Sequence, residues 1–249
     1  MPQLSAIVIT RDEAANIGAC LDSLAFCEER IVVDSGSTDA TVDIARQKGA
    51  RVEFHPWRGY GPQKNHALSL ATGEWVLSID ADEQVTPALA AAIKGVLSES
   101  GVDGWEFPRL SSFCGRQMRH SGWYPNYVLR LFRRGKASFE DVIVHESVIC
   151  AGPVKRLAEP LIHHPVHRLE DALSRMDRYS TASAAALAAS GRRVSFLTGI
   201  GHGLFAFLRT YVLRAGFLDG AEGFLLAFAN AEGSYYRYMK LWLATRARK

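Results

Sequence analysis

The chain has 249 residues, of which 48% are hydrophobic and 22% are charged, a composition typical of one large globular domain or two small ones. Its four cysteines are scattered without a Cys-x-x-Cys pair, which argues against a zinc site or a disulfide framework and favours a reducing compartment. The net charge of +3 is uneven, because residues 1–191 carry −3 and residues 192–249 carry +6.

The first hundred residues alternate between short apolar runs and segments of helical pattern. Strands are predicted at 5–10, 30–34, 51–54 and 75–79, and helices at 16–25, 40–48, 62–70 and 87–98. Ser37 or Asp39 is expected to cap the second helix. The first run has no basic leader and predicts a strand, not a signal peptide. This alternation is typical of βαβ units around a parallel sheet.

The pattern changes after Gly101. Extended segments at 104–108, 127–132 and 142–148 predict a mixed or antiparallel extension of the sheet, and helices are predicted at 169–190 and from 194 onward. The longest uncharged run, 194–208, is shorter than the roughly 20 residues that a spanning helix needs, so no transmembrane segment is predicted. The predicted fold class is therefore α/β, a mixed, mainly parallel sheet flanked by helices, with a helical C-terminal extension.

Acidic residues follow the predicted strands where each strand ends. Asp80 and Asp82 come directly after the apolar run 75–79, and Asp34 ends the second strand. Ligands of open α/β sheets bind outside the carboxyl ends of the strands, and an Asp-x-Asp pair there suits Mg²⁺ or Mn²⁺. The alternative is a set of solvated acidic turns, which is the preferred interpretation for Asp39.

Four motifs resemble, in order and spacing, the family 2 inverting glycosyltransferases of GT-A fold. They are Ile7-Val-Ile-Thr10-Arg-Asp12-Glu13, Val32-Val-Asp34-Ser-Gly-Ser37-Thr-Asp39, Gly61-Pro-Gln-Lys64-Asn65 and Asp80-Ala-Asp82. Together they cover about the first hundred residues. The chain departs from the common form of the first motif, because Ile9 and Asp12 stand where proline and asparagine are usual.

The resemblance implies a binding site for the nucleoside of a UDP-sugar. Thr10 and Glu13 would contact the uracil and the ribose, and Asp34 would accept a hydrogen bond from the uracil N3–H.

The resemblance also implies a site for the diphosphate. Lys64 would reach the base or the phosphates, Asp80 would lie near the ribose and the metal, and Asp82 would ligate Mg²⁺ or Mn²⁺. A metal ion and a lysine would stabilise the negative charge that grows on departing UDP.

An inverting transfer needs a base for the acceptor hydroxyl, and a carboxylate suits that role. The resembling subgroup has a Val-His-Glu sequence after an Arg-Leu-Phe-Arg-Arg strand, here residues 130–134, which favours Glu146 as the base. Asp141 is the second candidate, and two surface acids without a catalytic role are the alternative.

Further residues are candidates for the acceptor side. Trp123, Tyr124 and Arg130 could line an acceptor pocket by sugar stacking and phosphate pairing, with core packing as the alternative for the aromatic residues. In the cluster His163, His164 and His167, one histidine is expected to reach the diphosphate or the metal, while the others are structural.

The basic, aromatic tail with Gly216-Phe-Leu-Asp-Gly220 resembles that of bacterial lipopolysaccharide-core β-1,4-glucosyltransferases. This resemblance implies transfer of glucose from UDP-glucose to a lipid-linked saccharide at the cytoplasmic face of the inner membrane. We therefore predict a catalytic domain at 1–168, divided into a nucleotide-sugar half (1–100) and an acceptor half (101–168), and a membrane-associating extension at 169–249.

Other functions are weighed against this one. A non-catalytic membrane-surface module that binds sugar nucleotides, or a family 2 transferase acting on a polysaccharide or polyprenyl phosphate, remains an alternative. A dinucleotide oxidoreductase is disfavoured because residues 10–13 contain no glycine fingerprint. No nucleic-acid partner is predicted, because the positive charge is confined to the tail.

Overall fold

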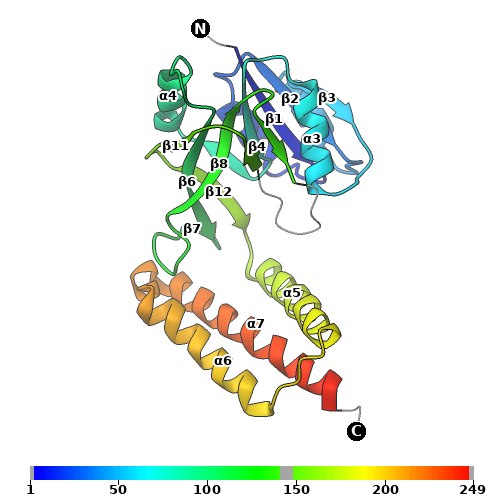
Figure 1. Cartoon of the computed structure of the whole chain (residues 1–249), viewed down its shortest axis with the longest axis vertical. Helices are drawn as coiled ribbons and strands as arrows, with labels where there is room; N and C mark the ends of the chain where they lie inside the picture. The colour runs from blue at the N-terminus through cyan, green and yellow to red at the C-terminus, as the bar shows by residue number, and fades with distance from the viewer. Residues whose placement is uncertain (1–2, 141–147, 247–249) are drawn as a thin grey trace. The chain divides into compact units, whose positions relative to one another are not determined.

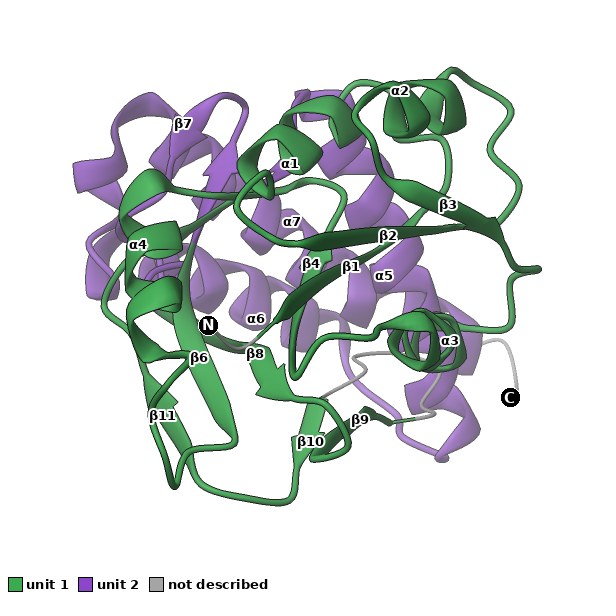
Figure 2. Cartoon of the chain, turned by 90° about the horizontal axis from the view of Figure 1, so that it is seen from above, with its two compact units in different colours: residues 1–109, 126–163 green, residues 110–125, 164–249 purple. Residues whose placement is uncertain are grey.

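The computed structural model describes residues 3–140 and 148–246. The chain divides into two compact units, one formed by residues 1–109 and 126–163 and the other by residues 110–125 and 164–249 (Figure 2). The boundary falls within two strands, β6 (Gly104–Phe113) and β12 (Leu161–Val166). The predicted division at residue 168 concerned functional roles and stays a prediction.

The first unit is built on a mixed sheet (Figure 1). Its parallel part has the order β3-β2-β1-β4, formed by Arg51–Phe54, Glu29–Asp34, Leu4–Thr10 and Trp75–Asp80. β8 (Asn126–Arg133) continues the sheet antiparallel to β4, and β6 lies antiparallel to β8. β12 follows and pairs antiparallel with β5 (Glu83–Val85). The predicted mixed, mainly parallel sheet is confirmed.

Helices cover both faces of the parallel strands (Figure 2). On one face, α1 (Ile17–Ser23), α2 (Thr41–Gln47) and α4 (Pro87–Val96) contribute to a core with Trp75 and Leu77. On the other face, α3 (Tyr60–Leu70) packs against residues that include Ile7, Val76 and Phe132. Burial on both faces explains why β1 and β4 are apolar along most of their length, whereas β3, at the edge of the sheet, is largely exposed and carries Arg51 and Glu53.

Several predicted boundaries were wrong. α3 begins at Tyr60, two residues before Pro62, because proline is tolerated throughout a first helical turn. α2 begins at Thr41 after Ala40, and Asp39 accepts a hydrogen bond from the Thr41 N–H at 3.0 Å.

Short strands were not predicted, since two or three residues are too few to show alternation. They are β5, β7 (Arg116–Gln117), β9 (Ala137–Phe139), β10 (Val148–Cys150) and β11 (Val154–Arg156). Most of the predicted strand 142–148 lies outside the described residues.

The second unit contains the predicted helical extension. α5 (Leu169–Ala189) and α6 (Phe196–Leu208) both pack against α7 (Gly220–Arg246). A π-helical turn, η1 (Arg209–Leu213), continues α6, and a 3₁₀ turn, η2 (Gly216–Asp219), leads into α7. In the described part of the chain, Phe196–Leu213 is the one helical stretch long and apolar enough to cross a membrane, judged by length and composition alone. It exceeds the predicted uncharged run because the helical turns continue through Arg209.

Candidate active site

Three predicted site residues lie at the carboxyl ends of adjacent parallel strands. In the pairing of β1 with β2, Thr10 is opposite Asp34, and in the pairing of β1 with β4, Ile9 is opposite Asp80. The ends that carry Thr10, Asp34 and Asp80 therefore meet at one edge of the sheet, which is where open α/β folds bind their ligands.

The loops after β1 and β2 are joined by hydrogen bonds. The backbone N–H of Asp12 donates to Ser37 Oγ at 2.8 Å, and that of Glu13 donates to Thr41 Oγ1 at 2.8 Å. In return, Asp12 Oδ1 accepts from the Thr38 N–H at 2.7 Å. Asp12, which stands where the usual form of the first motif has asparagine, thus links the two loops through its carboxylate.

Asp34 is 4% exposed and organises its own turn. Its Oδ2 accepts from the N–H groups of Gly36 (2.8 Å) and Ser37 (3.0 Å), and its Oδ1 accepts from the Ser37 hydroxyl. A carboxylate has about four lone-pair positions, so capacity for one further donor remains. The neighbouring Thr10 Oγ1 is buried and has no hydrogen-bond partner among the described residues, which gives a ligand a second polar contact.

Asp80 lies between two basic side chains. Lys64 Nζ, from α3, is 2.8 Å from Asp80 Oδ1, and Arg130, from β8, donates to Asp80 Oδ2. Both basic side chains are largely buried. The structure therefore brings the predicted residues Lys64 and Asp80 together, and it places Arg130 in this cluster.

Glu83 was not predicted as a site residue, although it follows Asp82 directly. Its side chain is fully buried, and its Oε2 accepts from the Asp80 N–H at 3.0 Å. Its Oε1 accepts from Arg130 at 2.6 Å and from Arg109 at 3.4 Å. Glu83 thus fixes both the backbone at Asp80 and the guanidinium that pairs with it.

Charge governs the ionisation of this cluster. Burial raises the pKa of Asp80, but the positive charges of Arg130 and Lys64 outweigh it and hold that pKa well below its usual range. Burial likewise lowers the pKa of Arg130, and the charges of Asp80 and Glu83 outweigh it in the opposite direction. Asp80 and Arg130 are therefore both ionised at neutral pH.

Asp82 has a different partner. His163 Nε2, from β12, lies 3.4 Å from Asp82 Oδ2. Burial raises the pKa of Asp82, whereas the hydrogen bond and charge of His163 lower it below its usual value. His163 was predicted only as one of three candidates. In the same cluster, His164 Nδ1 is 3.0 Å from Ser112 Oγ, and its ring stacks on that of His167.

This pair suits a divalent cation that takes its other ligands from a diphosphate. Two ligands of an octahedral Mg²⁺ site on adjacent corners are about 3.0 Å apart, close to the separation of the Asp82 and His163 donor atoms. No group of three potential protein ligands occurs in the part of the chain that the structure describes. The carboxylate suits Mg²⁺ or Mn²⁺, which commonly bind through one or two protein carboxylates plus phosphate and water, and His163 Nε2 would join it as a ligand only after losing its proton.

The predicted bases, Asp141 and Glu146, lie outside the described residues. The strand that precedes them is fixed to α3, because Asn65 Nδ2 donates to the Phe139 carbonyl and Asn65 Oδ1 accepts from the Phe139 N–H, both at 2.9 Å. Lys64 Nζ lies 5.7 Å from the Phe139 ring centroid. The nucleotide motif of α3 thus anchors the chain two residues before Asp141.

Comparison with known proteins identifies the family. The family model described as glycosyl transferase family 2 matches residues 5–150. The chain belongs to this family. It is 32% identical to the lipopolysaccharide core biosynthesis glycosyltransferase LpsC of Rhizobium meliloti, over 94% of this chain and 93% of that protein. It is also 31% identical to an uncharacterized glycosyltransferase of Rickettsia felis, over 97% of this chain and 90% of that protein.

Similarity to solved structures is partial. S. aureus TarS matches 73% of this glycosyltransferase and 39% of its own chain, with a TM-score of 0.49 and 19% identity. A Mycobacterium tuberculosis glucosyl-3-phosphoglycerate synthase, crystallised with Mn²⁺, uridine diphosphate and glucosyl-3-phosphoglycerate, matches 46% of this chain and 45% of its own, with a TM-score of 0.37 and 28% identity.

Proposed function

We propose that this glycosyltransferase moves a hexose, in the first instance glucose from UDP-glucose, onto a lipopolysaccharide inner-core sugar or another lipid-linked saccharide. The transfer inverts the anomeric carbon, requires Mg²⁺ or Mn²⁺, and takes place at the cytoplasmic face of the bacterial inner membrane. The name of LpsC, a relative that matches nearly the full length of both chains, supports the acceptor class.

The cluster at the sheet edge carries this proposal. Lys64 and Arg130 place two positive charges on Asp80, at the end of the strand that leads to Asp82. Fixed positive charge and a divalent cation are what the growing charge on a departing diphosphate needs. Because these side chains are already paired and largely buried, they need little rearrangement when the donor binds.

We assign the metal to Asp82 and His163, with the diphosphate and water as its other ligands. A bound cation would neutralise the diphosphate and polarise its bond to the sugar. Asp80, whose two oxygens are already taken by Lys64 and Arg130, orients these basic groups next to the metal.

Either Glu146 or Asp141 supplies the base, and Glu146 is the first choice. Support for Glu146 comes from the resembling Val-His-Glu sequence, and support for an acid near the site comes from the anchoring of Phe139, two residues before Asp141, by Asn65.

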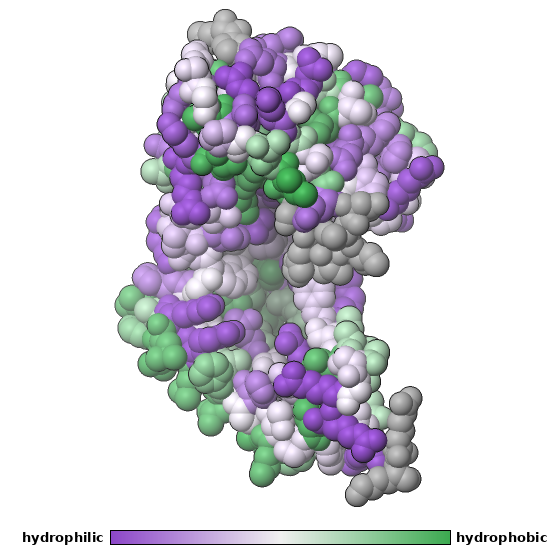
Figure 3. All heavy atoms as spheres, in the orientation of Figure 1, coloured by the Kyte–Doolittle hydropathy of each residue, from purple (hydrophilic) through white to green (hydrophobic). Residues whose placement is uncertain are grey.

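The helical unit supplies support for membrane contact. Apolar side chains gather over α6 and its continuation (Figure 3), where Leu197, Leu204 and Leu213 are between 61% and 72% exposed. A cavity of about 590 Å³ between α6 and α7 is lined by apolar and aromatic residues that include Phe207 and Phe228. Exposed apolar helices in a basic segment suit the interface of an anionic bilayer.

The direct test is release of UDP from UDP-glucose with Mn²⁺ or Mg²⁺, with purified lipopolysaccharide core as acceptor. We expect Asp82→Ala to lower kcat/KM by about two to three orders of magnitude, as the loss of one preorganised electrostatic group does elsewhere. Asp43→Ala, which removes an exposed carboxylate from α2, is the matched control and should behave as wild type. Equal turnover by the Asp82 variant and wild type would refute the assignment of the metal.

Membrane contact has its own test, co-sedimentation with vesicles of phosphatidylglycerol and phosphatidylcholine. Leu204→Ser with Leu213→Ser should reduce the bound fraction, because both apolar side chains are exposed on the helical unit. Val154→Ser, an exposed apolar position of the first unit, is the control. Equal binding by both variants and wild type would argue against this membrane-contact surface.

A further inference from the structure

The helical unit contains a second cavity, which has a strong excess of positive charge. It has a volume of about 520 Å³ and is lined by residues of α5, of α6 with η1, of α7 and of a loop around residues 121–123. Four arginines line it, and the described residues of its lining include no aspartate or glutamate. The four, here called the arginine cavity residues, are Arg175, Arg209, Arg214 and Arg237.

These arginines have no counter-charge in the described part of the chain, where no carboxylate forms an ion pair with any of them. Arg175 donates a hydrogen bond to the Pro165 carbonyl at 3.0 Å, and the other three arginines are exposed residues. Four like charges around one cavity repel one another unless an anion joins them. The cavity is therefore complementary to a ligand with concentrated negative charge.

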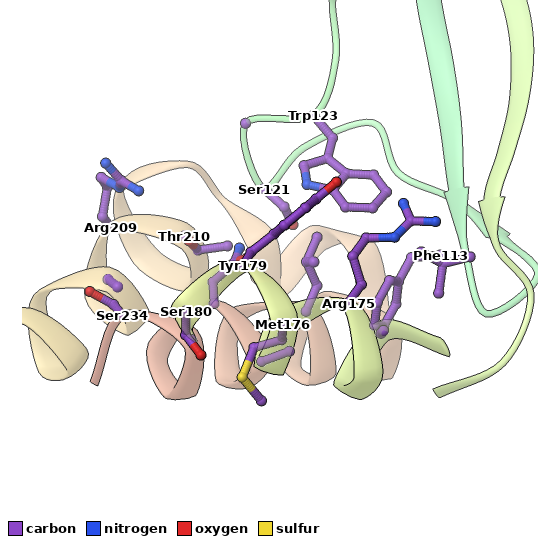
Figure 4. Close-up of a pocket in the computed structure, with 18 of the residues that line it drawn as sticks. Phe113, Ser121, Trp123, Arg175, Met176, Tyr179, Ser180, Arg209, Thr210 and Ser234 are labelled. Carbon is purple, nitrogen blue, oxygen red and sulfur yellow. The ribbon is translucent and has the colours of Figure 1, made fainter. Parts of the chain in front are cut away.

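Aromatic rings complete the lining. Trp123 packs edge to face on Phe113 with ring centroids 6.0 Å apart. Figure 4 shows Tyr179 and Arg175 extending from α5 toward Trp123, with Arg209 at the opposite end of the cavity. An aromatic face can cover the C–H face of a pyranose, while guanidinium groups bind phosphate oxygens in pairs. The two kinds of side chain suit a sugar that carries a phosphate.

The loop that carries Trp123 is held by the motif at residues 216–220. Asp219 is 2% exposed and accepts from the N–H groups of Arg119 (3.0 Å) and His120 (3.1 Å) and from the Ser121 hydroxyl (2.8 Å). These hydrogen bonds from the loop to the buried Asp219 carboxylate fix the loop, so Trp123 is positioned at the cavity before any ligand binds.

Arg214 lies directly across this loop at Gly122. A Cβ atom on Gly122 would fall 2.3 Å from Arg214 Nη1 and 2.5 Å from its Cδ, so only a glycine there lets the arginine take this position. The backbone also ties the two segments, because the Ser121 N–H donates to the Arg214 carbonyl at 2.9 Å. The location of the Arg214 charge at the cavity is thus determined by the loop.

We propose that the arginine cavity binds a phosphate ester of a saccharide, with the phosphate on the guanidinium groups and the sugar ring against Trp123 and Tyr179. This proposal rests on the proposed function in one respect, because it identifies the bound group as the anionic part of the acceptor. The same chemistry can come from a soluble sugar phosphate or from a phosphorylated, lipid-linked saccharide.

Calorimetric titration of the full chain with glucose 6-phosphate, at low ionic strength and without donor or metal, tests the site directly. We expect Arg209→Gln combined with Arg237→Gln to weaken binding about tenfold or more, because two charge-assisted contacts are lost. The charge-matched control is Arg178→Gln combined with Arg192→Gln, two exposed arginines outside the cavity, and it should bind as wild type. No binding by wild type, or an equal loss in both double variants, would overturn the proposal.

Further titrations identify the ligand. Glucose should not bind detectably, and inorganic phosphate should bind more weakly than glucose 6-phosphate, because it lacks the ring. Equal binding of the two phosphates would overturn the saccharide part of the proposal. Phosphatidylcholine vesicles with a phosphorylated glycolipid are compared with phosphatidylglycerol vesicles. Loss of glycolipid binding in the Arg209 and Arg237 variant supports a lipid-linked source, whereas loss confined to phosphatidylglycerol would overturn a saccharide ligand.

Failure of the arginine-cavity proposal can be distinguished from failure of the proposed function, because the titration contains neither donor nor metal. Release of UDP by wild type without binding of glucose 6-phosphate would overturn the arginine cavity alone. Binding that depends on Arg209 and Arg237, without release of UDP from any nucleotide sugar, would overturn the transferase assignment alone.

Discussion

The two units differ in whether their clustered basic side chains are paired with carboxylates. At the sheet edge of the first unit, Lys64 and Arg130 are largely buried and each contacts a carboxylate. In the second unit, the arginine cavity residues line one cavity, and none has an ion-pair partner in the described part of the chain. The comparison suggests two kinds of preparation for an anion. At the first site the positive side chains are already held in ion pairs before a ligand arrives, whereas at the second site they are left for the ligand to pair.

This contrast has an energetic consequence. Breaking a buried ion pair leaves an uncompensated charge in a poorly solvated place, which is strongly destabilising. An exposed arginine without a partner is hydrated by water, and its removal from a cluster of like charges relieves repulsion. Stability measurements should therefore separate the two sites before any ligand is known.

The largest effect is expected for Arg130→Leu. The substitution leaves Glu83, which is fully buried, with Arg109 at 3.4 Å as its remaining basic partner among the described residues and with its hydrogen bond from the Asp80 N–H, and it removes a partner from Asp80. We expect the free energy of unfolding in urea to fall by about 3–5 kcal/mol. Arg209→Leu in the cavity is the counterpart, and its stability should equal or exceed that of wild type. Similar losses in both variants would remove the distinction between the two sites.

Asp219→Ala should follow in size, because its carboxylate serves the loop of the second unit as Glu83 serves the edge of the first. Loss of hydrogen bonds from Arg119, His120 and Ser121 should lower the free energy of unfolding by about 2–4 kcal/mol, because one hydrogen bond to a charged group contributes about 1.5–3 kcal/mol and several are lost together. Glu222→Ala, whose partly exposed side chain is 3.8 Å from Arg116, is the control and should lose far less. A loss no greater than that of the control would show that Asp219 does not hold the loop.

The parts of the first site that could be predicted from sequence share one physical basis. Parallel strands end at the same edge, so polar residues placed after apolar runs, such as Thr10, Asp34 and Asp80, had to come together once the strands were recognised. The helix that carries Lys64 was also predicted from local sequence, by its motif and its proline.

The remaining contacts depend on pairings that no local pattern encodes. Arg130 reaches Glu83 because β8 joins the sheet antiparallel to β4 in a particular register, across 47 residues of sequence. His163 lies next to Asp82 because it is part of β12, a strand in which two consecutive histidines interrupt the alternation of apolar and polar residues. The arginine cavity is harder still to foresee, because its four charges come from α5, from the two ends of η1 and from α7, which meet only through helix packing.

Acid unfolding of the metal-free protein tests the ion pairs of Asp80 at the sheet edge. The folded-state pKa of Asp80 is below its unfolded value of about 3.9, so its contribution to stability is complete above that pH and is lost as pH falls toward the folded pKa. Asp80→Asn removes this contribution at every pH. The stability difference between wild type and Asp80→Asn should therefore be constant near neutral pH and shrink below about pH 4, by up to about 1.4 kcal/mol per pH unit. A difference that does not change with pH would contradict the ion pairs of Asp80.

The smallest effect on stability is expected for alanine substitutions at two glycines. The same two variants give the sharpest test of the arginine cavity. Gly122 and Gly115 have φ of +77° and +87°, so alanine at either position should cost a similar amount, about 1–2 kcal/mol. They differ in surroundings, because nothing lies within 4 Å of a Cβ on Gly115, whereas a Cβ on Gly122 displaces Arg214.

The two alanine variants should thus have similar urea midpoints, while only Gly122→Ala weakens binding of glucose 6-phosphate. Moving one guanidinium away from the cavity removes a charge-assisted contact without changing the net charge of the protein, which separates the position of the charge from its amount. If both variants bound the sugar phosphate equally well, Arg214 would be excluded from the site, and the remaining arginines would have to account for the affinity.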